Sequence, residues 1–234
     1  MKLTVVIPAY NEAHRLGATL TELLAWLDAH HPDSDVLVVS DGSSDATVAI
    51  AQSFAGRRVQ VLANPRNHGK GYVVRQGMLA ATGDYVLFMD ADMATPIDQL
   101  PLFLAALDQG APFAYGIRTY QKYDHNFRLI LGLGFVMLAH LLVLRQPVMD
   151  TQCGFKIFRR EIAQRMFKRL RISGGIFDLE LFLIAQRLHL DGTCIPVRWN
   201  HVPGSRINIP KCVIGDPLDM LRIRCHDLLG HYHD

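Results

Sequence analysis

The chain has 234 residues, of which 50% are hydrophobic and 20% are charged, and its formal net charge at pH 7 is +2. This composition excludes a disordered protein, and the length fits one globular domain better than two. The small net charge excludes the strongly basic proteins that bind nucleic acid, so we expect no nucleic acid partner.

Four short segments that are almost entirely apolar predict strands buried on both faces of a sheet. They span residues 3–7, 36–39, 59–62 and 85–89. Segments with apolar residues at helical spacing lie between them, at residues 16–27, 47–54 and 72–81. This alternation predicts an α/β fold with a mostly parallel sheet that carries helices on both faces.

Polar segments follow three of these strands directly, at residues 8–12, 40–44 and 90–92. In open α/β sheets the ligand binds beyond the carboxyl ends of the strands. We therefore expect the three segments to share one rim of the sheet. Asp90 and Asp92 stand one residue apart on this rim, where two carboxylates can approach a hard divalent cation that also binds substrate phosphates. Taken alone, such a pair is equally typical of a solvated turn.

Residues 67–71, with the sequence NHGKG, are compatible with a loop that cradles phosphate. Their glycines allow close backbone approach, and Lys70 supplies a positive charge. The spacing differs from that of a P-loop, which disfavours a kinase or an ATPase. The alternative is a glycine-rich turn that begins the next helix.

The second half of the chain predicts a strand at residues 113–117 and two helices that can meet a membrane surface. Residues 129–144 form an apolar stretch of about 24 Å as a helix, shorter than the roughly 30 Å hydrocarbon core. It is therefore either a buried core helix or an interfacial one. Residues 217–229 are a second amphipathic candidate. Basic residues cluster at 159–171, where they can face anionic lipid or form a solvated helix face.

Several segments together resemble a known family. VVIPAYNE at 5–12, VVSDGSSD at 38–45, NHGKG at 67–71 and DAD at 90–92 resemble the family 2 glycosyltransferases of GT-A fold, in the family's order. DTQCGFK at 150–156, FDLE at 177–180, VRW at 197–199 and GSR at 204–206 look like the branch of dolichyl-phosphate glucosyltransferases and polyprenyl-phosphate sugar synthases. The resemblance implies one glycosyltransferase domain. Residues 1–110 would form its nucleotide-sugar-binding half. Residues 111–234 would form its acceptor half, with interface helices at 126–145 and 216–230.

The resemblance also implies roles for individual residues. The nucleoside pocket would be lined by Pro8, Tyr10, Glu12 and Asp41, with Asp41 accepting from the base edge. Lys70 would lie close to the nucleotide, and Asp90 and Asp92 would bind the donor and a Mg²⁺ or Mn²⁺ ion. Arg206 would reach the diphosphate. The donor sugar and the reacting groups would be contacted by Gln152, Asp178 and Glu180. Arg118 and Arg128 are candidates for binding the acceptor's phosphate, or else ordinary surface arginines.

The resemblance favours inverting transfer of a hexose, glucose from UDP-glucose, to a polyprenyl phosphate such as dolichyl phosphate. Mannose-transferring relatives often carry a glutamine where this chain has Ala94, which weighs against mannose. One alternative is a glycosyltransferase that acts on a hydroxyl and uses Asp178 or Glu180 as its base. Others are a nucleotidyltransferase and a non-catalytic sugar-nucleotide-binding protein. The short apolar N-terminus and the unpaired pattern of four cysteines predict a cytoplasmic protein, at the cytoplasmic face of a membrane if its acceptor is a lipid. The sequence leaves the oligomeric state open.

Overall fold

The core of the protein is a seven-stranded sheet in the order β3-β2-β1-β4-β6-β5-β7. The strands span Leu3–Ala9 (β1), Asp35–Asp41 (β2), Val59–Asn64 (β3), Tyr85–Met89 (β4), Phe113–Arg118 (β5), Phe155–Arg159 (β6) and Thr193–Val197 (β7). β1 to β4 pair in parallel, as do β5 and β7, whereas β6 runs antiparallel to both of its neighbours. The four strands predicted in the first half and the one at residues 113–117 are confirmed, and so is the mostly parallel sheet.

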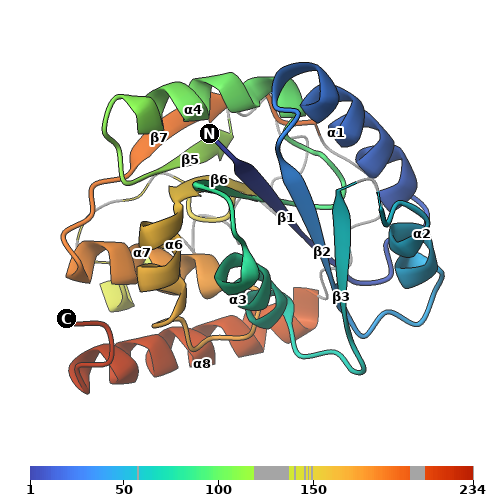
Figure 1. Ribbon diagram of the computed structural model, residues 1–234. Coiled ribbons are helices and arrows are strands. Elements are labelled where there is room, and N and C mark those ends of the chain that lie inside the picture. Colours follow the sequence, from blue (N-terminus) through green and yellow to red (C-terminus); the bar gives the residue numbers. More distant parts are fainter. Residues whose placement is uncertain are drawn as a thin grey trace.

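Helices cover both faces of the sheet, as predicted (Figure 1). They span Leu16–His30 (α1), Thr47–Ser53 (α2), Lys70–Ala80 (α3), Leu100–Asp108 (α4), Arg160–Phe167 (α6), Phe177–Arg187 (α7) and Ile209–Leu228 (α8), with a 3₁₀ turn at Ile97–Gln99 (η1). α1, α2 and α4 pack on one face through an apolar core of their own. α3, α6, α7 and α8 pack on the other. The central strands β1, β2 and β4 alternate their side chains between these two cores, which is why they are largely apolar.

The computed structural model describes residues 1–56, 58–118, 137–139, 141–144, 146, 148, 150–200 and 209–233, with only the backbone of 209–214. Two residues predicted to bind phosphate, Arg128 and Arg206, lie outside this part of the chain, as does most of the predicted helix at 129–144.

The antiparallel strand β6 decides where the second half of the chain meets the first. Its first residue, Phe155, pairs with Met89, the last residue of β4. The segment at 150–154 that precedes β6 therefore arrives at the carboxyl end of β4, directly beside Asp90. Because β6 is antiparallel to both of its neighbours, it brings the second half of the chain to the same rim as the first half.

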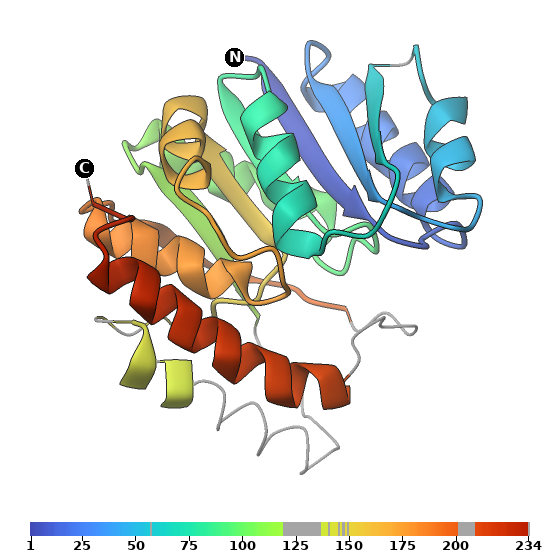
Figure 2. The same cartoon turned by 90° about the horizontal axis from the view of Figure 1, so that it is seen from below.

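α8 is longer than the helix predicted at 217–229 and presents two different faces. Met220 and Ile223 are buried against the core, whereas Leu218 and Leu221 are 52% and 50% exposed. Residues 137–139 and 141–142 are also helical and belong to the same side of the molecule (Figure 2). Within the described residues, every helix is too short or too polar to cross a bilayer.

Candidate active site at the carboxyl ends of the strands

The three polar segments predicted to share one rim do come together. The backbone N–H of Asn11 donates to Ser43 Oγ at 3.1 Å, and the side-chain oxygen of Asn11 accepts from the N–H of Ser44 at 2.8 Å. Thr19 on α1 donates its hydroxyl to the carbonyl of Ala91 at 2.7 Å. These bonds link the segments that follow β1, β2 and β4. The carboxyl ends of these parallel strands therefore form one continuous polar surface.

Asp90 is paired with Lys70 at the centre of this surface. The Nζ of Lys70 lies 2.7 Å from Asp90 Oδ1, and each side chain is about one-third exposed. Burial would lower the pKa of Lys70, but the negative charges of Asp90 and Asp178 outweigh it, so the pKa is raised. Lys70 is therefore a cation at neutral pH, directly beside the first aspartate of the DAD segment.

Gly154 leaves the space that the Asp90 side chain occupies. The N–H of Asp90 donates to the carbonyl of Gly154 at 3.1 Å. A Cβ atom on Gly154 would lie 1.9 Å from Asp90 Oδ2 and 2.4 Å from its Cγ. No residue other than glycine fits here without moving the carboxylate. The sequence motif at 150–156 contains this glycine, but only the structure shows what it is for.

Asp92 faces a second cation that the sequence analysis missed. Its Oδ2 lies 3.6 Å from Nη1 of Arg15, and its Oδ1 accepts from the N–H of Ala94 at 3.1 Å. Arg15 is also ion-paired with Glu12, three residues earlier. Burial raises the pKa of Glu12, although Arg15 opposes this. The i,i+3 spacing of Glu12 and Arg15 was the available signal, because such residues meet on one side of a helical turn.

The backbone of the 67–71 loop is bonded to the protein itself, which fits the alternative of a glycine-rich turn at the start of the next helix. The N–H groups of His68 and Gly69 donate to the two carboxylate oxygens of Asp41, at 2.7 and 2.9 Å. The N–H of Gly71 donates to the carbonyl of Ser173 at 2.9 Å. Cβ atoms on Gly69 and Gly71 would lie 2.3 and 2.4 Å from the carbonyl oxygens of Ser173 and Ile172. The glycines therefore admit another stretch of the protein's own backbone.

Asp41, which was predicted to line the nucleoside pocket, has a buried side chain. Its side chain is 3% exposed and both oxygens hold the 68–69 backbone. Pro8 is likewise buried, within β1, whereas Tyr10 is exposed directly after that strand. Of these three residues, Tyr10 alone presents its side chain at the surface of the rim.

Asp178 and Glu180 are both buried, and each has internal partners. Asp178 Oδ1 lies 2.6 Å from the Nζ of Lys156, which also donates to the carbonyls of Thr151 and Cys153. Glu180 is 0% exposed and accepts from two backbone N–H groups and a tyrosine hydroxyl. The Glu180 carboxylate thus holds the surrounding structure through three internal donors. These contacts give Glu180 a structural role and do not support its predicted catalytic one.

Arg118 is bound to Asp150 in a bidentate pair. Its Nε and Nη2 lie 2.7 and 2.9 Å from the two Asp150 oxygens, and its guanidinium lies 5.6 Å from the ring centre of Trp199. Burial would raise the pKa of Asp150, but the hydrogen bonds from Arg118 dominate and lower it. Gln152 donates its N–H to the same carboxylate at 3.0 Å. Arg118 is therefore a fixed, partly buried cation beside the rim.

The chemistry of Asp90 and Asp92 fits a divalent cation. Both carboxylates are partly exposed on the rim, and each faces a positive charge that a metal ion would replace. Mg²⁺ and ions like it bind through one or two carboxylates and take their remaining ligands from water and substrate phosphate. In the part of the chain that the structure describes, no group of three or more His, Cys, Asp or Glu residues forms a complete metal cage. Such a site would depend on the substrate's phosphates.

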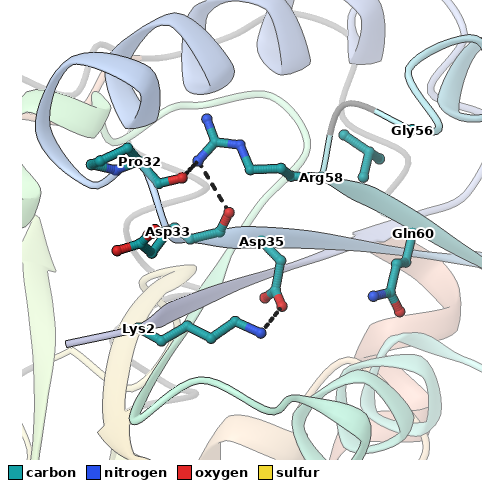
Figure 3. Close-up of a pocket in the computed structure, with 9 residues that line it drawn as sticks. Lys2, Pro32, Asp33, Asp35, Gly56, Arg58 and Gln60 are labelled. Carbon is teal, nitrogen blue, oxygen red and sulfur yellow. Dashed lines mark hydrogen bonds and ion pairs between the residues drawn. The ribbon is translucent and has the colours of Figure 1, made fainter.

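A hollow of about 480 Å³ lies elsewhere (Figure 3). It is lined at the amino ends of β1 to β3 by Lys2, Asp35 and Arg58, among others. Lys2 Nζ pairs with Asp35 at 2.8 Å, and Arg58 donates to the carbonyl of Pro32. Lys2 and Asp35 thus pair within this hollow, and Arg58 is also ion-paired with Asp28, at the end of the strands opposite Asp90. We therefore assign the active site to the rim, on the basis of the chemistry of its residues.

Comparison with known proteins shows which family the chain belongs to. The model of glycosyl transferase family 2 matches residues 4–167. The dolichyl-phosphate beta-glucosyltransferase of Drosophila melanogaster is 39% identical, over 88% of this chain and 69% of the relative. The enzymes of the same name from Homo sapiens and Saccharomyces cerevisiae are 33% and 30% identical, over 98% and 99% of this chain and 76% and 77% of theirs.

Solved structures with the same fold include two sugar-phosphoglycerate synthases. The mannosyl-3-phosphoglycerate synthase of Rubrobacter xylanophilus has a TM-score of 0.69 at 18% identity, covering 98% of this chain and 75% of that one. The glucosyl-3-phosphoglycerate synthase of Mycobacterium tuberculosis, in complex with Mn²⁺ and UDP-glucose, has a TM-score of 0.64 at 20% identity, covering 98% and 78%. The fold is thus of the GT-A type, and the chain belongs to glycosyl transferase family 2.

Proposed function

We propose that the protein transfers glucose from UDP-glucose to dolichyl phosphate or a similar polyprenyl phosphate, with inversion at the anomeric carbon. The names of the relatives from two animals and one fungus support the sugar and the acceptor. The Mn²⁺ and UDP-glucose in the M. tuberculosis structure support a metal-dependent use of that donor. Asp90 and Asp92 would hold the ion, which neutralises the leaving diphosphate when it is bound.

The state of the two candidate bases favours a phosphate acceptor over a hydroxyl. A hydroxyl must lose its proton during attack, so an enzyme that uses one needs a positioned base. Asp178 is occupied by Lys156, and Glu180 is buried among its own donors. A phosphate monoester is already ionised near neutral pH, with a second pKa of about 6. It needs to be bound and aimed, which is the task that we propose for Arg118.

Product analysis tests this function. The purified protein is incubated with UDP-glucose, Mn²⁺ and dolichyl phosphate in detergent or vesicles, and the lipid product is identified by mass. We expect a monoglucosylated dolichyl phosphate, a β-linkage and release of UDP. Transfer to phosphate-free sugars or alcohols under the same conditions, without lipid product, would instead support the hydroxyl-acceptor alternative. Release of pyrophosphate from a nucleoside triphosphate would support a nucleotidyltransferase.

We also propose that the protein works at a membrane surface, which a lipid acceptor requires. α8 and the helical residues near 140 lie on the same side of the molecule (Figure 2). Six large apolar side chains on these segments and just after α8 are at least half exposed. They are Met137, Leu141, Leu218, Leu221, Leu228 and Leu229. An amphipathic helix of this kind binds in the interfacial region of a bilayer.

The basic cluster at 159–171 contributes less to such a surface than its charge suggests. Arg159 and Arg160 donate to the carbonyls of Ala111 and Thr82, and Arg169 to that of Arg165. We therefore expect binding to vesicles to depend mainly on apolar burial. Leu221→Ser with Leu228→Ser should abolish flotation with vesicles, whereas 0.5 M salt should weaken it only in part. Flotation that is unchanged in the double variant would count against α8 as the contact.

A further inference from the structure

Tyr232, close to the C-terminal end of the sequence, is fully buried and bonded to Glu180. Its hydroxyl donates to Glu180 Oε1 at 2.6 Å, and both side chains are 0% exposed. Tyr232 follows α8, which lies along α7, the helix that carries Glu180 (Figure 2). A buried carboxylate must have partners, and here one of them comes from a residue 52 positions later in the chain.

Glu180 uses its other hydrogen bonds to hold the segment between α6 and α7. Its Oε1 also accepts from the N–H of Arg171 at 2.9 Å, and its Oε2 accepts from the N–H of Ile172 at 2.7 Å. One side chain thus fixes the end of the chain and the 171–173 segment at the same time. If the tyrosine hydroxyl is removed, this carboxylate loses one of its three donors and the segment becomes less restrained.

The 171–173 segment in turn packs against the start of α3 with almost no space between the two backbones. The carbonyl of Ser173 accepts from the N–H of Gly71 at 2.9 Å. A Cβ on Gly69 would lie 2.3 Å from this carbonyl oxygen. The residue between these glycines is Lys70, whose Nζ lies 2.7 Å from Asp90. A shift of the segment would therefore press on the backbone that carries this lysine.

We propose that Tyr232 is a positioning residue for the donor site: through Glu180 and the 171–173 segment it fixes the start of α3 and so holds Lys70 against Asp90. The inference rests on the proposed function only in taking these two residues as the donor's charged contacts. It makes the C-terminal helix a part of the site's architecture, although its residues lie outside the rim.

The test compares two tyrosines that each donate to a carboxylate. Tyr232→Phe removes the bond to Glu180, and Tyr85→Phe removes a similar bond to Asp108, 3.0 Å long, at the amino end of β4. In Tyr232→Phe we expect faster hydrogen exchange at the amides of Gly71 and Ile172 and on the order of tenfold weaker UDP-glucose binding. The KM of the acceptor should stay unchanged. Tyr85→Phe should show none of these effects at a similar thermal midpoint.

A double-mutant cycle shows whether the effect passes through Lys70. In a Lys70→Ala background, Tyr232→Phe should cause no further loss of UDP-glucose affinity, because the side chain that it positions is gone. Multiplicative losses, or exchange at Gly71 that matches the Tyr85→Phe control, would overturn the inference. Exchange and UDP-glucose binding do not require turnover. A wild-type protein that binds UDP-glucose but makes no dolichyl product would therefore refute the proposed function and leave this test intact.

Discussion

The ammonium group of Lys70 lies 2.7 Å from the carboxylate of Asp90, and the start of α3 that carries this lysine is held from two sides. Asp41 holds the backbone before it, and Ser173 holds the backbone after it. A divalent cation and a diphosphate are thus expected to meet an Asp90 that already has a cationic partner. When the donor binds, its phosphates can take over Lys70 while the metal takes over Asp90, so no charge is left unpaired.

Removing either rim carboxylate should therefore stop catalysis without unfolding the protein. We expect Asp90→Asn and Asp92→Asn each to lower kcat by about 10²–10³-fold or more, because each removes charge stabilisation of the leaving diphosphate. EDTA should have the same effect on the wild type, and Mg²⁺ or Mn²⁺ should restore the rate. The measurement is initial rate with UDP-glucose and dolichyl phosphate.

The control for these variants is Asp28→Asn. Asp28 is ion-paired with Arg58 at the opposite edge of the sheet, so its loss tests the general effect of removing a paired carboxylate. We expect its kcat to equal that of the wild type. A protein that keeps full activity after exhaustive chelation would exclude the proposed metal role of Asp90 and Asp92.

Gly154→Ala should damage the site as much as a change to Asp90 itself. The added methyl group would lie 1.9 Å from Asp90 Oδ2, so the carboxylate must move. We expect a loss of kcat of about 10²-fold, the size seen when one charge-stabilising group is lost. Gly215→Ala is the matched control, because its Cβ meets no atom within 4 Å, and in a helix it should be neutral or slightly stabilising. Normal activity of Gly154→Ala would show that Asp90 tolerates displacement.

Much of the first half of the fold was predictable because its strands lie between two helical layers and are apolar throughout. β6 was missed because Lys156 and Arg159 interrupt its apolar pattern. Lys156 is buried only because Asp178, 22 positions later, comes to meet it. β7 was missed because it is a largely exposed edge strand that contains Pro196, a residue tolerated at sheet edges.

Site residues could be predicted from the sequence where the residue type alone suits the chemistry. They could not be predicted where the role of a side chain depends on a distant hydrogen-bond partner. Asp90, Asp92 and Lys70 were expected at the donor site, and the structure pairs Lys70 with Asp90. The sequence around Glu180 resembles that around an acidic active-site residue. The role of Glu180, however, depends on Tyr232, 52 positions away. Long-range pairs of this kind leave no local pattern, so the sequence suggested a base where the structure has a structural carboxylate.

Because of the Arg118–Asp150 pair, we expect the free energy of unfolding to change with pH in the acid range. The pKa of Asp150 is lower in the folded protein than in the unfolded chain, so the folded state binds fewer protons. The stabilisation is complete above the ordinary aspartate pKa of about 3.9 and is lost as pH falls through it toward the folded value. Asp150→Asn should therefore cost roughly 1–3 kcal/mol in unfolding free energy at pH 7, and progressively less below pH 4. Urea denaturation across this range measures the difference, which a pH-independent cost would contradict.

Lys156 should be far more important to stability than an exposed lysine. Lys156→Met leaves Asp178 charged, buried and without its partner, which typically costs about 3–5 kcal/mol. Lys2→Met breaks the more exposed pair with Asp35 and should cost about 1 kcal/mol or less. Both values come from urea denaturation at pH 7. Equal losses in the two variants would mean that Asp178 is protonated or solvated once Lys156 is gone.

The pH dependence of Asp178→Asn decides between the two kinds of acceptor. Burial raises the pKa of Asp178 against the charges of Lys156 and Lys70, so a base at this position would titrate above the ordinary aspartate value. The acceptor phosphate titrates at about pH 6, so a limb in the wild-type profile can come from either group. With a phosphate acceptor, kcat/KM should keep this limb in Asp178→Asn, at whatever reduced rate. If the limb disappears in the variant, Asp178 is the base and the acceptor is a hydroxyl.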